Sequence, residues 1–241
     1  MITNNDQTEH NKLSNSEKIK MAAIKLFSIY GYGSTTVRMI AKEAGLSAGQ
    51  LTVHYGSKEE LYESIIQDAI KISNDKIGAV KHKREQFIKD GTYTKEHIWE
   101  LIEQMVNELI DYSFIPYNRA CIMMLNITLP NSVIVENASK SFQDVILEQH
   151  EIFMAELLQD YAERKGYLKF RVISRAVNGA IVSFAEHQDF LMSEVYVHKN
   201  RADHGENDLA VTYAKGHLKN FILNSLKNID IMKDITKVEK Y

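Results

Sequence analysis

The chain has 241 residues and a mass of 27.7 kDa, and its hydrophobic content of 44% supplies a sizeable core, which excludes a disordered protein. Its single cysteine, Cys121, excludes an intramolecular disulfide framework. The polar first 11 residues do not resemble a signal peptide, and no apolar run is long enough to span a membrane. The net charge of −3 hides a basic segment, because residues 12–62 carry seven basic and four acidic residues. We therefore expect a cytoplasmic protein, without a membrane partner, whose N-terminal block faces an anionic partner.

Glycines divide the N-terminal part of the chain into short helices. Five of the eleven glycines fall within residues 31–56, and glycine favours turns because it adopts positive φ without strain. Apolar residues at three- and four-residue spacing predict helices over residues 14–31, 35–45 and 47–56, each with serine or threonine available as a cap.

Longer helices are expected in the rest of the chain. Proline breaks helices, and the two prolines, Pro116 and Pro130, lie far from most of these residues. A fourth helix begins at Lys58 and is followed by a loop over residues 89–95. Further helices are expected over residues 96–113, 117–127, 132–164, 170–197 and 208–226. The fold class is therefore all-α.

Residues 35–55 have the pattern of a helix-turn-helix. Two short helices are joined by Ala44-Gly45-Leu46-Ser47, and the second helix carries small or polar residues and no carboxylate. Such a helix suits close approach to phosphates and base edges in the major groove. The alternative is that the two helices only pack a helical bundle.

Residues 22–66 closely resemble the N-terminal domain of the tetracycline-repressor (TetR) family of transcriptional regulators. The matching pieces are Ala22-Ala23-x-x-Leu26-Phe27, Gly31-Tyr32, Thr35-Thr36-Val37, Ile40-Ala41, Ala44-Gly45-Leu46-Ser47, Gly49-x-Leu51, His54-Tyr55 and Ser57-Lys58-Glu59-Glu60-Leu61. One departure is Thr52, which stands where the family usually has an aromatic residue. The rest of the chain agrees with the family in helix number and length, not in a motif.

The resemblance implies DNA contacts in and around the second and third helices. Helix N-termini present N–H groups to phosphates, a glutamine can pair with adenine through two hydrogen bonds, and Lys58 is placed to contact a phosphate. Tyr55 is expected mainly in the core, with its hydroxyl toward the backbone. The expected DNA-binding residues are Thr36, Arg38, Gly49, Gln50, Thr52, His54, Tyr55 and Lys58.

The resemblance also implies a ligand pocket and a dimer interface in the remainder of the chain. A methionine-rich interior without a cluster of Lys or Arg suits a largely hydrophobic ligand. The expected pocket residues are Met105, Tyr112, Met123, Met124, Phe153, Phe184 and His187. The last two long helices are expected to pair with their two-fold mates through Ile173, Val177, Ile181, Leu218 and Phe221.

The expected organisation is a tail (1–13), a helix-turn-helix DNA-binding domain (14–60), a helical ligand-binding and dimerisation domain (61–228) and a charged tail (229–241). The expected function is a homodimeric repressor that a hydrophobic small molecule releases from a palindromic double-stranded DNA operator. No enzymatic motif, cofactor or metal site is expected. Two alternatives stay open: a helical scaffold that does not bind DNA, and a regulator whose body is filled and binds no ligand.

Overall fold

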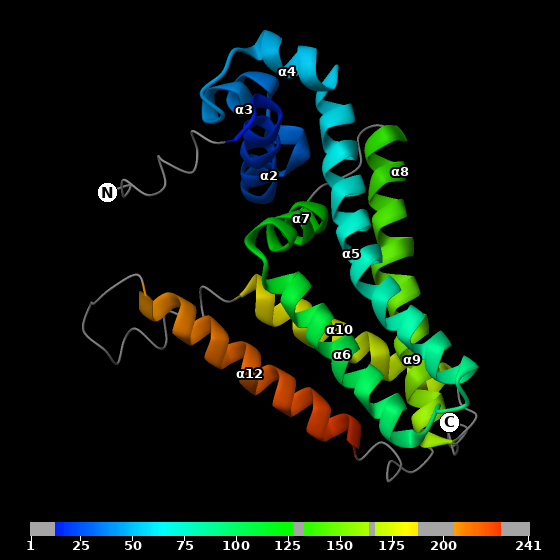
Figure 1. Ribbon diagram of the computed structural model, residues 1–241. Helices are drawn as coiled ribbons and strands as arrows, with labels where there is room; N and C mark the ends of the chain where they lie inside the picture. Colours follow the sequence, from blue (N-terminus) through cyan, green and yellow to red (C-terminus); the bar gives the residue numbers. More distant parts are fainter. Residues whose placement is uncertain (1–12, 128–132, 164–166, 188–204, 228–241) are drawn as a thin grey trace, which may run out of the picture. The chain divides into compact units, whose positions relative to one another are not determined.

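The computed structural model describes residues 13–127, 133–163, 167–187 and 205–227, and within these ranges every regular element is helical (Figure 1). The all-α prediction is confirmed. No helix in this part of the chain is long and apolar enough to cross a membrane. The elements are α2 (Asn15–Ser34), α3 (Val37–Glu43), α4 (Ala48–Tyr55), α5 (Lys58–Lys89), α6 (Lys95–Phe114), α7 (Pro116–Ile127), α8 (Val133–Phe142), η1 (Gln143–Glu148), α9 (Gln149–Ala162), α10 (Tyr167–Glu186) and α12 (Gly205–Lys227).

The chain divides into two compact units. Unit 1 comprises Met1–Asp75 and Tyr112–Gln149, and unit 2 comprises Lys76–Asp111 and His150–Tyr241. Helix α5 contributes its first part to unit 1 and its last part to unit 2. The boundary expected after residue 60 separates the DNA-binding domain from the ligand-binding and dimerisation domain. It is a functional boundary, which the division into compact units does not test, so it stays a prediction.

Capping boxes define the helix starts in the N-terminal part of unit 1. At α2, the Ser14 N–H donates to Glu17 Oε2 (2.8 Å) and the Glu17 N–H donates to Ser14 Oγ (3.3 Å). At α5, Ser57 and Glu60 exchange the same pair of bonds, both 3.1 Å long. Each box satisfies two backbone donors that have no partner inside the helix, so short helices can begin at fixed residues.

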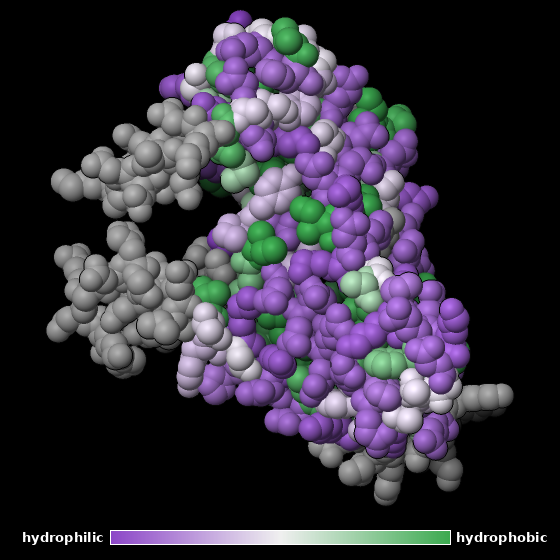
Figure 2. Space-filling model, viewed as in Figure 1, coloured by the Kyte–Doolittle hydropathy of each residue, from purple (hydrophilic) through white to green (hydrophobic). Residues whose placement is uncertain are grey.

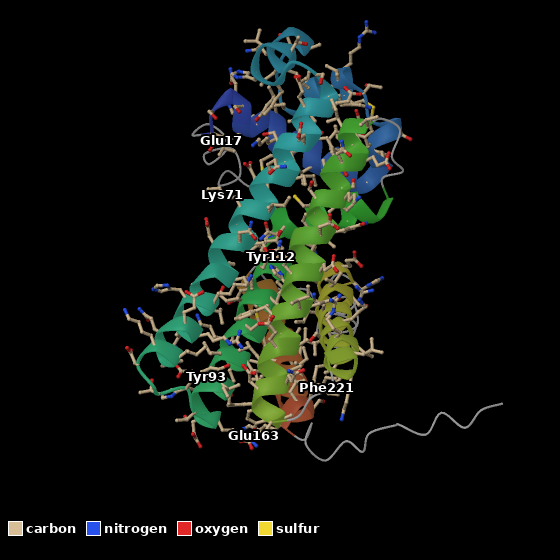
Figure 3. The ribbon with its side chains drawn as sticks, turned by 90° about the vertical axis from the view of Figure 1, so that its right-hand side faces the viewer. Glu17, Lys71, Tyr93, Tyr112, Glu163 and Phe221 are labelled. Atoms are coloured by element: carbon tan, nitrogen blue, oxygen red, sulfur yellow. The ribbon has the colours of Figure 1, made fainter. Side chains whose placement is uncertain are left out.

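Aromatic rings fill the core of unit 1. Tyr62 of α5 lies 5.8 Å from Phe27 and 5.3 Å from Tyr32 between ring centroids, both in edge-on arrangements, and all three residues are buried. Helix α7 packs against α2, and α8 runs alongside the first part of α5, where Tyr62 Oη and Ser139 Oγ are 3.1 Å apart (Figures 1 and 3). Helix α2 therefore shares its aromatic core with α5.

Charged groups connect the helices of unit 2. The Arg84 guanidinium on α5 donates to Glu156 (2.9 Å) and to Asp160 (2.7 Å) on α9. Arg175 of α10 donates through Nε and Nη2 to the Glu151 carboxylate of α9, which is only 4% exposed. Burial of a carboxylate is costly unless it is paired, so this contact fixes α10 against α9.

The long helix expected over residues 132–164 is interrupted. A six-residue π-helical segment, η1, separates α8 from α9. Periodicity does not reveal it, because a π turn shifts the apolar stripe by a single residue. Helix α10 is described to Glu186, and residues 188–197 of the expected helix lie outside the described residues, as do both expected tails apart from Leu13.

Candidate nucleic-acid interface

Helices α3 and α4 form a helix-turn-helix at the positions expected from the sequence. Thr36 caps α3 by accepting a hydrogen bond from the Met39 N–H (3.2 Å). Gly45 has φ +69°, a conformation that L side chains rarely adopt, and the Leu46 N–H closes the turn on the Ala41 carbonyl (2.9 Å). Leu51, 1% exposed, anchors α4 in the core.

The outward face of α4 is small, polar and free of carboxylates. Gly49, Thr52, Val53 and His54 are exposed, whereas Leu51 is buried and Tyr55 is half-buried. No side chain of α4 carries a negative charge. This face can therefore approach a polyanion without charge repulsion.

The start of α3 adds a positive charge. Thr36 and Arg38 are both exposed on its first turn. Among the described residues, Arg38 makes no ion pair or hydrogen bond, in contrast to Lys25, whose ammonium lies 2.5 Å from Glu43 Oε1. Arg38 is therefore available for a partner, and its expected contact with DNA stays a prediction.

Gln50 has a structural role that its assignment as a base contact did not anticipate. Its Oε1 accepts a hydrogen bond from the Ser47 N–H (3.0 Å), which forms a capping box at the start of α4. A bidentate contact with adenine needs this same oxygen as the acceptor for N6. The amide Nε2 remains a donor, so Gln50 can give a hydrogen bond to a base while it keeps the cap.

Gln50→Glu separates these two roles. A glutamate at the third helical position keeps the capping box and suits the positive end of the helix dipole, so we expect an unchanged or slightly higher melting temperature. The added carboxylate faces phosphates, and DNA affinity should fall tenfold or more. Gln50→Ala should instead lower stability by about 1 kcal/mol, because the hydrogen bond from the Ser47 N–H is lost. Circular dichroism melting together with fluorescence anisotropy measures both effects; equal DNA affinity of Gln50→Glu and wild type would place Gln50 away from DNA.

Lys58 is held inside unit 1 by the end of α2. Its ammonium donates to the carbonyl oxygens of Tyr32 and Thr35, both at 2.9 Å, and lies 4.0 Å from the centroid of the Tyr32 ring. Burial lowers the pKa of Lys58, and the neighbouring Glu59 opposes this shift. The sequence predicts a phosphate contact, but here the ammonium satisfies backbone carbonyls. The sequence shows only that Lys58 stands at the start of a helix. It could not reveal these two hydrogen bonds, because the accepting carbonyls belong to a distant segment of the chain.

Tyr55 also points inward. Its hydroxyl donates to the Ser16 carbonyl (2.9 Å) and lies 2.6 Å from Ser16 Oγ, so it joins α4 to the first turn of α2. This matches the expectation that Tyr55 is mainly a core residue. Tyr55 is also among the DNA-binding residues expected from the sequence. That contact stays a prediction, and the bond to Ser16 does not favour it because it engages the hydroxyl inside unit 1.

The expected ligand residues are distributed over both units. Tyr112, Met123 and Met124 belong to unit 1, and the Tyr112 hydroxyl (Figure 3) donates to the Ala69 carbonyl (3.2 Å). Met105 and Phe153 are buried in unit 2.

The expectation that Phe184 and His187 line an interior pocket needs correction. Phe184 is 40% exposed and His187 is exposed with Nδ1 2.9 Å from the Ser183 carbonyl of its own helix. Both side chains lie on the surface of unit 2. Helical spacing identified the helix, but the face that points inward is set by its neighbours.

The expected dimer stripe needs a similar correction. Ile181 and Leu218 are 0% and 3% exposed and Val177 is 9% exposed, so they are enclosed by their own protomer. Ile173 is half-buried, whereas Phe221 (labelled in Figure 3) is 69% exposed. An apolar stripe shows which face is covered, but not whether the same chain or a second copy covers it.

The family model of bacterial regulatory proteins of the tetR family matches residues 19–65, which include α3, α4 and the start of α5. This N-terminal part of the chain is therefore similar to TetR-family transcriptional regulators. A transcriptional regulator of Bacillus subtilis, YerO, described as uncharacterised, is 29% identical over 149 residues, which are 61% of this chain and 47% of YerO. The negative regulator of the Staphylococcus epidermidis biofilm operon, IcaR, is 28% identical over 102 residues, which are 42% of this chain and 54% of IcaR. The chain thus spans about half the length of each of these two relatives.

Solved structures extend the likeness to the whole fold. AibR, determined in complex with isovaleryl coenzyme A and operator DNA, aligns with a TM-score of 0.54 over 85% of this chain and 97% of AibR, at 13% identity. At this identity the alignment establishes the TetR fold alone. The prediction of an N-terminal helix-turn-helix followed by a larger helical part is confirmed.

Proposed function

We propose that this chain is a dimeric transcriptional repressor of the TetR family that binds a palindromic operator and leaves it when a largely hydrophobic small molecule binds. The observation that carries the proposal is the outward face of α4, which is exposed and free of carboxylates, next to the exposed Thr36 and Arg38 of α3. These features suit insertion of α4 into a major groove and phosphate contacts from α3. IcaR, a negative regulator, supports repression as the direction of control.

Unit 2 supplies the surface for the proposed dimer. Of the six large apolar side chains that its described residues expose, five lie on α10 and α12. These five are Leu168, Val172, Phe184, Tyr213 and Phe221, and their exposed fractions run from 40% to 77%. Water-exposed apolar side chains gathered on two helices favour pairing with a second copy of the same helices.

The proposed ligand is mainly apolar because the buried candidates are. Met105, Met124 and Phe153 are at most 4% exposed, and methionine adapts to ligands of irregular shape. The AibR structure, which shares this fold, contains both a small molecule and operator DNA, so the fold can hold both kinds of partner. A ligand that prefers the protein in its DNA-free state weakens DNA binding, and by linkage DNA weakens ligand binding by the same factor.

Binding to DNA at several salt concentrations tests the proposal. We expect a specific complex with DNA from the region upstream of the chain's own gene. The logarithm of its affinity should fall linearly with the logarithm of the salt concentration, because phosphate contacts release counterions. Arg38→Ala should reduce this slope by about one if Arg38 contacts a phosphate. If the affinity were the same for every DNA sequence and did not change with salt concentration, a helical scaffold would be favoured instead.

A further inference from the structure

Val53 is the most exposed large apolar side chain in the described part of the molecule, with 83% of its surface accessible. Exposed apolar residues are common on proteins, and the face drawn in Figure 2 shows several among mainly hydrophilic neighbours. Exposure alone therefore says little. What distinguishes Val53 is its position on α4.

Helical geometry places Val53 at the centre of the outward face. Successive residues of an α-helix are about 100° apart, so Val53 lies nearly opposite the buried Leu51. Gly49, one turn earlier, shares this face and presents no side chain. A Cβ at Gly49 would meet nothing closer than Ser47 Oγ at 3.9 Å, so the fold does not require glycine there.

A glycine next to an exposed valine suits a helix that packs closely into a DNA groove. The Gly49 backbone can approach the DNA, and Val53 is then the exposed apolar side chain on that side of the helix. Its two methyl groups cannot exchange hydrogen bonds with base edges. The one apolar group that bases present in the major groove is the 5-methyl group of thymine.

We propose that Val53 determines specificity by packing against a thymine methyl group, at one base pair in each half-site. This inference rests on the proposed function, because it needs α4 in the major groove. The neighbouring Thr52 and His54 are exposed on either side and can bond phosphates or polar base edges. Apolar contact at Val53 is thus a separate source of base preference from the hydrogen bonds.

Replacement of thymine by uracil tests the contact, because it removes the methyl group and leaves every hydrogen bond intact. The DNA is the strongest site that the wild-type chain selects from random double-stranded DNA, with each thymine replaced in turn. At one position per half-site, uracil should weaken wild-type binding about fourfold, the effect expected from one buried methyl group. Val53→Ala should bind the unmodified site more weakly and show no further loss with uracil.

Two controls keep the result interpretable. Alanine is the stronger helix former, so Val53→Ala should keep its fold, which circular dichroism checks. Val133→Ala removes another highly exposed valine, on α8 (70% exposed), and should show the full uracil effect. If wild-type protein binds the selected site but uracil has no effect, or the same effect in Val53→Ala, the inference is wrong and the proposed function stands. If no DNA is selected, the proposed function itself fails.

Discussion

Lys58→Met is expected to lower the stability of the protein more than any other substitution of a basic residue in its N-terminal part. The methionine keeps the length of the side chain but cannot donate to the carbonyl oxygens of Tyr32 and Thr35, which Lys58 bonds at 2.9 Å. Hydrogen bonds from charged donors contribute about 1.5–3 kcal/mol, and the stacking of the ammonium on Tyr32 is lost as well. The melting temperature measured by circular dichroism should fall accordingly.

Lys42→Met provides the matched control, since Lys42 is exposed on α3. Its melting temperature should stay close to that of wild type. DNA binding, measured where both variants are fully folded, then decides between the two roles of Lys58. If Lys58 contacts a phosphate, the slope of log affinity against log salt concentration should be smaller by about one in Lys58→Met than in wild type. An unchanged melting temperature with a reduced slope would contradict the structural role.

Phe221→Asp is expected to abolish the dimer at micromolar concentration. Phe221 is 69% exposed in the protomer, so aspartate is tolerated there in a monomer. In the proposed interface the carboxylate would be buried without a partner, which is very costly. Light scattering after size-exclusion chromatography should report a monomer, and operator affinity should fall a hundredfold or more, because two half-sites are no longer bound by one particle.

Ile88→Asp is the control for Phe221→Asp. Ile88 is a 52% exposed apolar residue of unit 2 that belongs to α5 and not to α10 or α12. This variant should remain a dimer with wild-type operator affinity. Dimers of both variants, or a monomeric wild-type protein, would overturn the proposed interface.

Local signals were predicted well from the sequence. Serine and threonine were expected to cap the short helices, and the structure uses Ser14, Thr36 and Ser47. These caps and the turn at Gly45 depend on residues within four positions of one another, so spacing narrows the choice to adjacent candidates. The Ser47–Gln50 capping box has the same local pattern, but Gln50 was assigned to DNA because its amide also suits adenine. Two functions compatible with one side chain cannot be separated without a structure.

Long-range features could not be predicted in the same way. The carbonyl partners of Lys58 lie 26 and 23 residues away in the chain, and Ser16 lies 39 residues from Tyr55. The enclosure of Ile181 and Leu218 depends on which helices of the same protomer pack against α10 and α12. Periodicity gives the apolar face of a helix but contains no information on what covers it.

The sharing of α5 between the two units limits how DNA specificity can be exchanged between homologues. Leu61, Tyr62 and Ile65 follow the helix-turn-helix immediately and are 0% exposed in unit 1, where Tyr62 meets Phe27 and Tyr32. A chimaera joined after residue 60 would bring these side chains from another protein and would repack the core beneath the transplanted recognition helix. A crossover beyond Asp75 keeps this part of α5 with its own helix-turn-helix, and the α7 surface that packs against α2 must then be matched as well. Recombination of such regulators is therefore constrained by the interior of the DNA-binding unit more than by the residues that reach the groove.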